Sequence, residues 1–347
     1  MSWSRRDFGS LALLGGGSLL VAGSRIWAQT KPDIPIEKMK VMTGNVPSFV
    51  YGGFYVGLDR GYFAERGLEV ELVLTRGGDT AFQIAGNTLQ FAGGSPDSAF
   101  FNGLKRGMPL MAISSLAVNP TDESSNLLVV RKDLRDTGIV GKVEQLKGRK
   151  VANLVPGGIT EYLLMLQLRR GGLTLDDVEV VSPLGFPQMV DALTTKAIDA
   201  ALLPEPFATM AVKKGVAEVL EGKGDLGEQI LWIQANRDFA KQHPDVISNF
   251  LVGYLKAARD ITRETFKGPK ILEIMEKYTK VPSDITRAAS PPLLPPNGTL
   301  NIKSIMAQQE YHMSRGKLTY KDLIPAKDFV DTTYLDRAVA FLGRYPD

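Results

Sequence analysis

Residues 39–74 constrain the fold more than any other part of this chain, because they predict a strand, a helix and a second strand in direct succession. Residues 68–74 carry leucine or valine at every second position, and a shorter alternating run covers residues 39–43. A period of two indicates a strand with one buried face. The residues between the two runs are enough for a helical crossover, so we expect a βαβ unit with parallel strands.

The loop at 44–49, which follows the first of these strands, is the first candidate wall of a binding site. In an open parallel sheet, ligands bind beyond the carboxyl ends of the strands. The aromatic residues of this loop could stack on a ligand, but aromatic side chains beside such a loop are often plain core. The candidate contacts here are Pro47, Ser48, Phe49 and Tyr51.

The first 28 residues are expected to be a targeting segment rather than part of the fold. Arg5 and Arg6 form a twin arginine, an apolar run follows at 11–22, and Ala28 could be the last residue before cleavage. Twin-arginine signals direct export in bacteria. The apolar run is shorter than the about 20 residues of a membrane span. We therefore expect a periplasmic protein, the alternative being a cytosolic N-terminus that happens to be basic and apolar.

Composition excludes several classes of function. The chain has no cysteine, which rules out disulfides, cysteine nucleophiles, zinc–thiolate sites and lipid attachment through an N-terminal cysteine. The formal net charge is +3, and loss of residues 1–28 removes three arginines and one aspartate, which leaves +1. Without a basic stripe the chain has no electrostatic footprint for nucleic acid. The remaining length, about 320 residues, suggests two lobes.

Alternating strand and helix patterns continue beyond residue 74 and predict how the lobes are connected. A second compact set of βα units covers 146–203, and from Gln234 onward the pattern is mostly helical. Two short extended stretches, near 119–130 and 232–237, are expected to cross between lobes. This predicts a discontinuous lobe I (38–120 and 234–347), an inserted lobe II (121–233) and a hinge of two crossing strands.

Three segments carry a family resemblance: Gly61-Tyr62-Phe63 with Gly67-Leu68 and Val70, residues 146–151, and residues 198–207. The chain resembles the substrate-binding proteins of nitrate/sulfonate/taurine-type ABC importers, a group that includes binders of thiamine-pyrimidine precursors. It departs from the pattern at Gly57, where the family usually has alanine, at a small cost in helix propensity.

The resemblance implies an α/β fold of the type II periplasmic binding protein. It implies a monomer without a cofactor, which captures a small ligand in the cleft between lobes and delivers it to an ABC permease in the inner membrane. The ligand would be a sulfonate, nitrate, an aromatic acid or a pyrimidine-like compound. The alternative is a pyrimidine-processing enzyme or a ligand-sensing protein on the same fold.

Three glycine loops that join strands to helices supply further candidate ligand contacts. Helix N-termini favour anions, and glycine lets the backbone approach a ligand, although glycine can also serve turn geometry alone. Thr160 could cap its helix instead of binding ligand, and Arg76 could be a solvated charge. The loops contain Arg76, Gly77 and Gly78; Gly94, Ser95 and Asp97, with Ser95 the expected N-cap; and Gly157, Gly158, Thr160 and Glu161.

Glu205 is a further candidate, held between two prolines after an apolar strand. Its carboxylate could accept from a ligand amine, cap the next helix or pair with a lysine across the hinge. No catalytic set is visible: His243 precedes Pro244, His312 is expected on a surface helix, and neither is placed to form a recognisable triad. We therefore expect a binding protein with no catalytic residue and no metal site.

Overall fold

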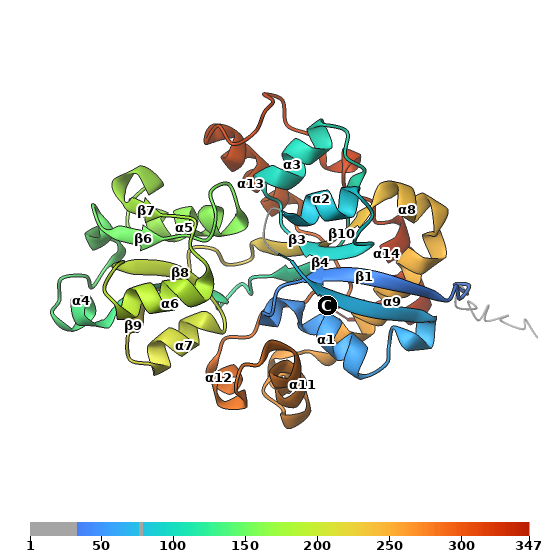
Figure 1. The fold of residues 1–347 in the computed structure, drawn as a ribbon, viewed down its shortest axis with the longest axis horizontal. Coiled ribbons are helices and arrows are strands. Elements are labelled where there is room, and N and C mark those ends of the chain that lie inside the picture. Colours follow the sequence, from blue (N-terminus) through green and yellow to red (C-terminus); the bar gives the residue numbers. More distant parts are fainter. Residues whose placement is uncertain (1–32, 76–78, 347) are drawn as a thin grey trace, which may run out of the picture. The chain divides into compact units, whose positions relative to one another are not determined.

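Two five-stranded sheets organise the chain in the computed structural model, which describes residues 33–75 and 79–346. Helices lie on both faces of each sheet (Figure 1). This confirms the predicted α/β two-lobe fold. In sheet A of lobe I the strands follow the order β2 (Leu68–Leu74), β1 (Met39–Asn45), β3 (Phe91–Gly94), β10 (Gln229–Asn236) and β4 (Leu110–Val118). In sheet B of lobe II the order is β7 (Glu179–Val181), β6 (Lys150–Ala152), β8 (Ala200–Pro204), β5 (Asn126–Arg131) and β9 (Ala217–Glu221).

The predicted βαβ unit is present at the edge of sheet A. β1 and β2 are parallel, with a register that runs from Met39 opposite Leu68 to Asn45 opposite Leu74. The helix α1 (Gly52–Asp59) forms the crossover, and a short 3-10 turn ends at Gly67. Gly67 has a φ of +77°, which explains glycine before the strand, because other residues rarely adopt this region.

The helices of lobe I surround sheet A and come from both ends of the chain. They are α1, α2 (Asp79–Ala85), α3 (Ser98–Lys105), α8 (Arg237–Gln242), α9 (Pro244–Asp260), α10 (Arg263–Phe266), α11 (Pro269–Thr279), α12 (Ser283–Ala288), α13 (Ile302–Ser314) and α14 (Thr333–Leu342). Those of lobe II are α4 (Lys132–Asp136), α5 (Ile159–Arg169), α6 (Phe186–Thr194) and α7 (Phe207–Lys213). The 3-10 turns are η1 (Phe49–Tyr51), η2 (Ala64–Arg66), η3 (Val143–Leu146), η4 (Leu175–Asp177) and η5 (Ala326–Asp328).

Aromatic side chains dominate the two cores of lobe I, one on each face of sheet A. On the first face Phe91 of β3 stacks on Phe250 of α9 at a centroid distance of 3.8 Å. On the second, Trp232 of β10 packs against Phe100 at 4.7 Å. Ring pairs of this kind add about 0.5–1.5 kcal/mol to the free energy gained from burial. The long helix α9 is therefore a structural part of lobe I.

Strand β10 is the main element that the sequence prediction missed. It pairs in antiparallel fashion with both β3 and β4, so the stretch expected to cross between lobes at 232–237 lies inside sheet A instead. Its central residues, 230–233, are all apolar because both faces of the strand are buried, so no alternation marks it as a strand. The chain crosses at 222–228. The predicted lobe boundaries at 120/121 and 233/234 stay a proposal. Because β10 belongs to sheet A, the second boundary is better placed before Gln229.

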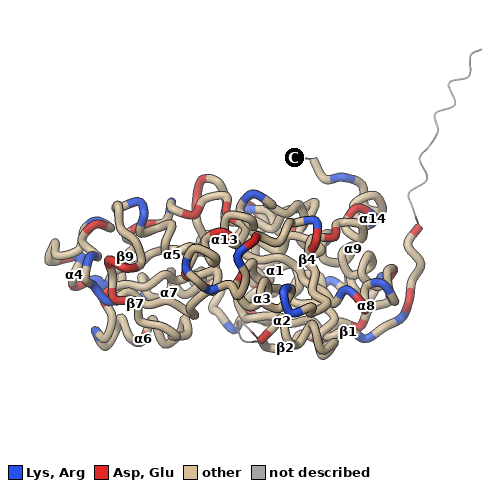
Figure 2. Tube along the Cα trace, turned by 90° about the horizontal axis from the view of Figure 1, so that it is seen from above, with Lys and Arg blue, Asp and Glu red and all other residues tan. Residues whose placement is uncertain are grey.

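Charged residues of both signs are interspersed along the chain, as Figure 2 shows. Within residues 33–75 and 79–346, no helix is both long and apolar enough to cross a bilayer. The predicted targeting segment, residues 1–28, lies outside the described residues.

Candidate functional site

Two buried asparagines end or follow parallel strands, one in each sheet. Asn45 is the last residue of β1 and is 3 % exposed, and Asn153 directly follows β6 and is fully buried. The Oδ1 atom of each has no hydrogen-bond partner among the residues that the structure describes. A buried oxygen without a partner costs about 1–3 kcal/mol. Both positions therefore need an explanation, and a bound donor would supply one.

The orientation of both amide groups follows from their other hydrogen bonds. Asn153 Nδ2 donates to the backbone carbonyl of Val155 at 3.2 Å, and a carbonyl can only accept. Asn45 Nδ2 donates to the hydroxyl of Tyr55 at 3.2 Å, and this hydroxyl in turn donates to the carbonyl of Val46 at 3.0 Å. The unpaired atoms are thus the amide oxygens, which can accept hydrogen bonds from a ligand.

The N-terminus of α5 lies close to Asn153 in the sequence and adds hydrogen-bond donors. Its N-cap residue is Gly158, and no side chain caps the helix. Thr160 Oγ1 is buried and has no partner within the described part of the chain, so the capping role considered for it is not made. Ser182 Oγ, just after β7, is likewise unpartnered there. Ligand contact by Thr160 stays a prediction.

Loops from the two lobes contact each other near the carboxyl ends of the parallel strands. The backbone amide of Ser98, at the start of α3, donates to the carbonyl of Gly157 at 3.0 Å. On the other side, Ser48 Oγ approaches the carbonyl of Glu205 at 3.4 Å. The structure thus brings four of the predicted segments together in two pairs: the loop before α3 with the loop before α5, and the loop after β1 with the turn after β8.

Asp97, and not Ser95, is the N-cap of α3, which corrects the prediction. Asp97 Oδ1 accepts from the backbone amide of Phe100 at 2.9 Å, and Ser95 Oγ donates to Asp97 Oδ2 at 2.9 Å. Pro96 therefore precedes the cap instead of opening the helix. Both carboxylate oxygens of Asp97 are engaged inside the protein. Ligand contact by Ser95 or Asp97 stays a prediction.

Glu205 is 3 % exposed and holds the start of α7. Its two carboxylate oxygens accept from the backbone amide and the hydroxyl of Thr209, at 3.0 and 2.8 Å. The amide of Ser290, in lobe I, lies 3.4 Å from the same carboxylate. Burial raises the pKa of Glu205. Of the three roles considered, the helix contact is present, and Glu205 also links the lobes.

The other predicted residues occupy varied surroundings. The Phe49 ring packs edge-on against Phe266 at 5.5 Å in the core, and Tyr51 donates to the carbonyl of Gly93 at 3.3 Å. Pro47 is partly exposed, and a side chain at Gly94 would collide with Gln234. Tyr311 of α13 donates to Glu161 at 3.3 Å. Arg76, Gly77 and Gly78 lie outside the described residues.

His312 is fully buried, which corrects the expectation of a surface helix position. Its Nε2 lies 3.1 Å from the carbonyl of Pro96, in the loop before α3, and burial lowers its pKa to about 4. The ring is therefore neutral at neutral pH and supports this loop as a donor. His243 instead pairs with Glu37 through Nδ1 at 2.9 Å.

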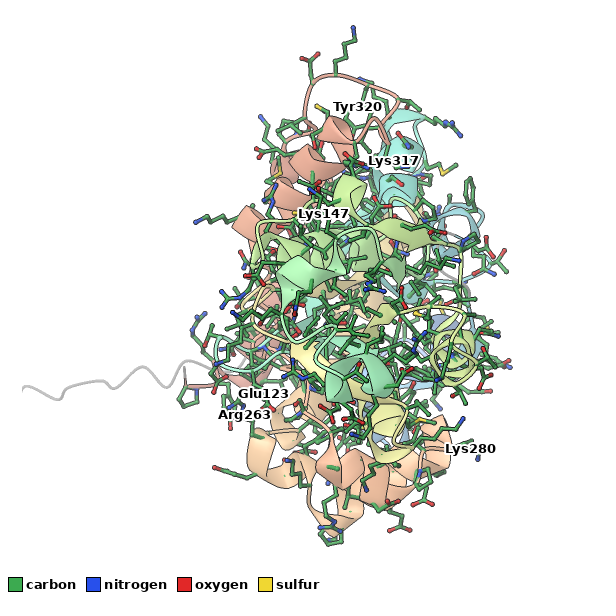
Figure 3. All side chains as sticks on the ribbon, turned by 90° about the vertical axis from the view of Figure 1, so that its left-hand side faces the viewer. Glu123, Lys147, Arg263, Lys280, Lys317 and Tyr320 are labelled. Atoms are coloured by element: carbon green, nitrogen blue, oxygen red, sulfur yellow. The ribbon has the colours of Figure 1, made fainter. Side chains whose placement is uncertain are left out.

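Ion pairs join the lobes away from the buried asparagines. Arg315 of α13 contacts both carboxylate oxygens of Asp176 at 3.0 Å each, and Lys213 of α7 pairs with Asp284 at 2.7 Å. Arg263, labelled in Figure 3, pairs with Asp122. All three pairs are substantially exposed, so each contributes about 0–1 kcal/mol.

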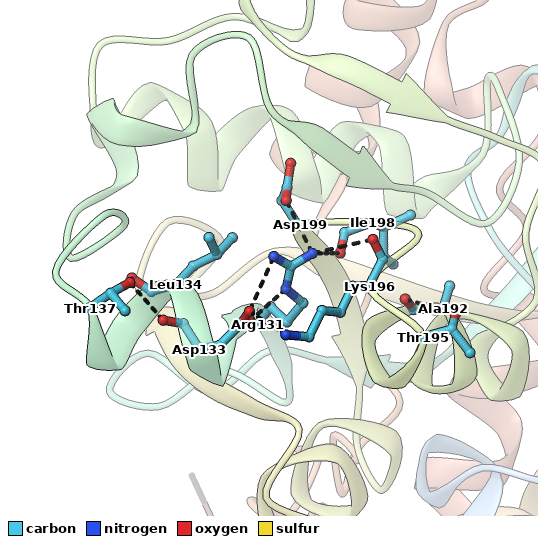
Figure 4. Close-up of polar contacts among 9 residues, drawn as sticks. All are labelled: Arg131, Asp133, Leu134, Thr137, Ala192, Thr195, Lys196, Ile198 and Asp199. Carbon is cyan, nitrogen blue, oxygen red and sulfur yellow. Dashed lines mark hydrogen bonds and ion pairs between the residues drawn. The ribbon is translucent and has the colours of Figure 1, made fainter.

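A cluster of ion pairs around Arg131 lies at the opposite ends of the strands of sheet B. Arg131, at the carboxyl end of the antiparallel strand β5, contacts Asp133 at 2.6 Å and Asp199 at 3.4 Å (Figure 4). It also donates to the carbonyls of Lys196 and Ile198. Because β5 is antiparallel to β8, this cluster lies at the amino-terminal ends of the parallel strands, away from the candidate site. We therefore assign it a structural role.

Sequence reasoning placed Asn45 in a candidate loop but did not select it, and it overlooked Asn153 and Ser182. A usable signal was present, because each is a polar residue at the end of an apolar strand or directly after it. Over the described ranges, no group of three or more histidine, aspartate or glutamate side chains is arranged to hold a metal ion.

Solved structures share this architecture. The nitrate-binding protein NrtA from Synechocystis PCC 6803 superposes with a TM-score of 0.74 and 16% identity, over 88% of this chain and 90% of that protein. The alkanesulfonate-binding protein SsuA from Xanthomonas axonopodis pv. citri gives 0.69 and 16%, over 85% and 99%. A DSZB variant in complex with biphenyl-2-sulfinic acid gives 0.60 and 12%, over 86% and 98%. At these identities the likeness shows the fold alone.

Sequence comparison identifies the family. A protein of Bacillus subtilis (strain 168) named "Putative binding protein YtlA" is 24% identical over 273 residues, which cover 73% of this chain and 79% of that protein. The "NMT1/THI5 like" family matches residues 48–264, more than half of the chain. The resemblance inferred from the sequence is confirmed: this chain belongs to the NMT1/THI5-like family.

Proposed function

We propose that this protein is the periplasmic solute-binding component of an ABC importer, which captures a small ligand between its lobes and delivers it to a permease. The observation that carries the proposal is the pair of unpartnered buried oxygens at the strand ends of the two sheets, Asn45 Oδ1 and Asn153 Oδ1. The contacts Ser98–Gly157 and Ser48–Glu205 support it, because they bring the adjoining loops of the two lobes together.

The chemistry of these atoms favours a ligand that carries N–H groups. Two amide oxygens accept hydrogen bonds, while Thr160 Oγ1 and the N-terminus of α5 can donate to an oxygen of the ligand. A ligand with a ring or amine N–H at one end and a carbonyl or acidic group at the other would satisfy both the protein's acceptors and its donors. Among the four expected ligand classes, pyrimidine-like compounds fit this requirement, as do those sulfonates and aromatic acids that carry an amino group. Nitrate offers no donor and fits it least.

The importer role, with a permease as partner and the periplasm as location, rests on the relatives described above. NrtA and SsuA are nitrate- and sulfonate-binding proteins by name, and the twin arginine at 5–6 would direct export. The DSZB likeness keeps an enzyme as the second candidate. The pairing of His312 Nε2 with Pro96 and of His243 Nδ1 with Glu37 supports a binding role, because each imidazole already uses one nitrogen in a structural contact.

A thermal-shift screen tests the proposal with nitrate, an alkanesulfonate, benzoate and an aminopyrimidine as probes. A ligand that binds the folded state only, at about 100 times its Kd, adds about 2.7 kcal/mol to the free energy of unfolding. Of these four probes, we expect the aminopyrimidine to raise the melting temperature. The shift should be clearly smaller in Asn153→Leu, because each tenfold loss of affinity removes about 1.4 kcal/mol of this stabilisation. The control Asp191→Asn, at an exposed position of α6, should behave like wild type. Chemical conversion of the bound probe would instead support the enzyme.

A further inference from the structure

The two segments that connect the sheets run side by side and are hydrogen-bonded to each other. The first joins β4 to β5 at 119–125, and the second joins β9 to β10 at 222–228. The amide of Asn119 donates to the carbonyl of Glu228 at 2.9 Å, and the amide of Gly227 donates to the carbonyl of Asn119 at 3.1 Å. Any rotation of one lobe on the other must change the backbone torsions of these segments.

The side chain of Asn119 fixes the geometry of the crossing. Its Oδ1 accepts from the amide and hydroxyl of Ser125, at 3.3 and 3.0 Å, and from Asn126 Nδ2 at 3.1 Å. Its Nδ2 donates to the carbonyl of Asp225 at 3.1 Å. Both crossing segments are thus held by one fully buried amide.

Asp225 is a fully buried carboxyl group at this crossing. Its Oδ1 accepts from Gln167 Nε2 at 2.9 Å, and its Oδ2 has no partner among the described residues. Gln167 belongs to α5, the helix whose N-terminus contributes to the candidate site, and its Oε1 accepts from the amide of Gly224 at 2.9 Å. Asp225 therefore connects both crossing segments with the helix that carries part of the site.

The surroundings of Asp225 do not suit a negative charge. A buried carboxylate is normally paired with a cation or bound by several donors. Here Gln167 Nε2 donates to it, and the nearby donors of Ser124, Asn119 and its own amide offset only part of the effect of burial on its pKa. Glu228 adds a second negative charge on the same segment, and burial raises the pKa of Asp225 to about 7. The other charged residues of the enclosing elements face elsewhere: Asp122 pairs with Arg263, Glu221 pairs with Arg170, Glu123 bonds to Ser290, and Lys223 is exposed.

We propose that Asp225 is a protonation switch of the hinge: its neutral form favours the lobe arrangement described here, and its ionised form favours a rotated arrangement in which the carboxylate meets water. The sign follows from linkage. A carboxyl group that holds its proton more tightly in one arrangement stabilises that arrangement at low pH, and the advantage is lost as pH rises. If the protein binds ligand between its lobes, as proposed above, ligand affinity would fall over the same pH range.

The hinge can be tested without any ligand, which separates this inference from the proposed function. Because the chain has no cysteine, Glu144→Cys in lobe II and Glu273→Cys in lobe I allow two spin labels to be attached specifically. Both glutamates are exposed and belong to different lobes. Electron–electron double resonance then gives the distance distribution between them from about pH 4 to about pH 8.5, which covers the range between the ordinary pKa of aspartate and the raised pKa of Asp225.

In the wild-type background we expect the distance population seen at low pH to fall about twofold or more as pH rises from about 4 toward 7, with a midpoint below pH 7 and little further change above it. Asp225→Asn, which mimics the neutral carboxyl, should keep the low-pH distribution throughout, and the control Asp191→Asn should titrate like wild type. If Asp225→Asn does not fold, Glu228→Gln replaces it and should move the midpoint to lower pH, because one negative charge near Asp225 is removed. A distribution that does not change with pH, or a transition that persists unchanged in Asp225→Asn or Glu228→Gln, would overturn the proposal.

Discussion

The backbone amide of Ser98 donates a hydrogen bond to the backbone carbonyl of Gly157 at 3.0 Å, and so joins the loop before α3 in lobe I to the loop before α5 in lobe II. Gly157 has a φ of +72°, and a Cβ added there would lie 2.5 Å from Ser98 Oγ. Glycine is therefore required twice, for the backbone conformation and for the close approach of the two lobes.

Replacing Gly157 by alanine tests this contact. We expect Gly157→Ala to lower the free energy of unfolding by about 1–2 kcal/mol and to weaken ligand binding several-fold, because the new methyl group pushes the loops apart. Gly215→Ala is the matched control, since Gly215 also has a φ of +72° but nothing within 4 Å of its Cβ position. It should lose stability only. Equal ligand affinity in the two variants would show that the contact does not matter for binding.

Asn153→Leu should separate ligand binding from stability. The substitution removes an unpartnered buried oxygen and also the bond from Nδ2 to Val155, and these effects on stability are opposite and each about 1 kcal/mol. The melting temperature should therefore change little, while ligand affinity falls about tenfold or more, as loss of one buried hydrogen bond to a ligand requires. Calorimetry measures both quantities. Unchanged affinity would remove Asn153 from the site.

Asp97→Ala should lower stability, in contrast to a residue that only contacts ligand. Loss of its bond to the amide of Phe100 removes the N-cap of α3, which costs about 0.5–2 kcal/mol. Asp97→Asn keeps the capping oxygen and should retain most of this stability. Denaturant unfolding distinguishes the two variants. If both unfold at the wild-type midpoint, the cap contributes nothing measurable.

The ion pairs of Arg131 with Asp133 and Asp199 predict how the free energy of unfolding depends on pH in the acid range. Hydrogen bonding to Arg131 lowers the pKa of Asp133 to about 2, so its contribution is present above the unfolded pKa near 4 and is lost as pH falls toward 2. Since Asp133 is 41% exposed, we expect a loss of about 0.5–1 kcal/mol and not the full value of the shift. Arg131→Met should cost about 2 kcal/mol at pH 7 and flatten this part of the pH profile. An unchanged profile would contradict the assignment.

Export can be tested at the targeting segment, which stays a prediction. Replacing Arg5 and Arg6 by lysine should retain the full-length chain in the cytoplasm, because the twin-arginine pathway reads this pair. Immunoblotting of periplasmic and cytoplasmic fractions measures the outcome. Continued appearance of the variant in the periplasm would mean that another route exports it.

The βαβ unit at 39–74 was predictable because local patterns alone specify it: alternation on two strands and a glycine at a positive φ before the second. Strand β10 was not, because its partners β3 and β4 lie more than a hundred residues upstream and because the two cores of lobe I bury both of its faces. A continuous apolar run carries no period, so only the sheet itself identifies it as a strand.

The candidate site was predictable as a set of loops but not as a set of atoms. The topology places the carboxyl ends of the parallel strands and the N-termini of the following helices on the same side of each sheet. For this reason the loops at 44–49, 94–97 and 157–161 could be predicted as site loops. Which side chains are already satisfied is a property of the folded chain: Asp97 and Glu205 are engaged by Phe100 and Thr209, while Asn45 keeps an unpaired oxygen. That distinction needs the hydrogen-bond partners, most of which the sequence does not reveal.

The position of β10 in sheet A has a consequence for how the chain is made. Strand β4, buried along nearly all its length, pairs in the sheet with β10 alone, and β10 is synthesised after the whole of lobe II. More than a hundred further residues must therefore be synthesised before β4 can pair with β10. In contrast, every strand of sheet B lies within 126–221. Contacts between residues distant in the sequence form slowly. We therefore expect lobe II, whose strands are close in the sequence, to fold before lobe I, whose two parts lie on either side of it.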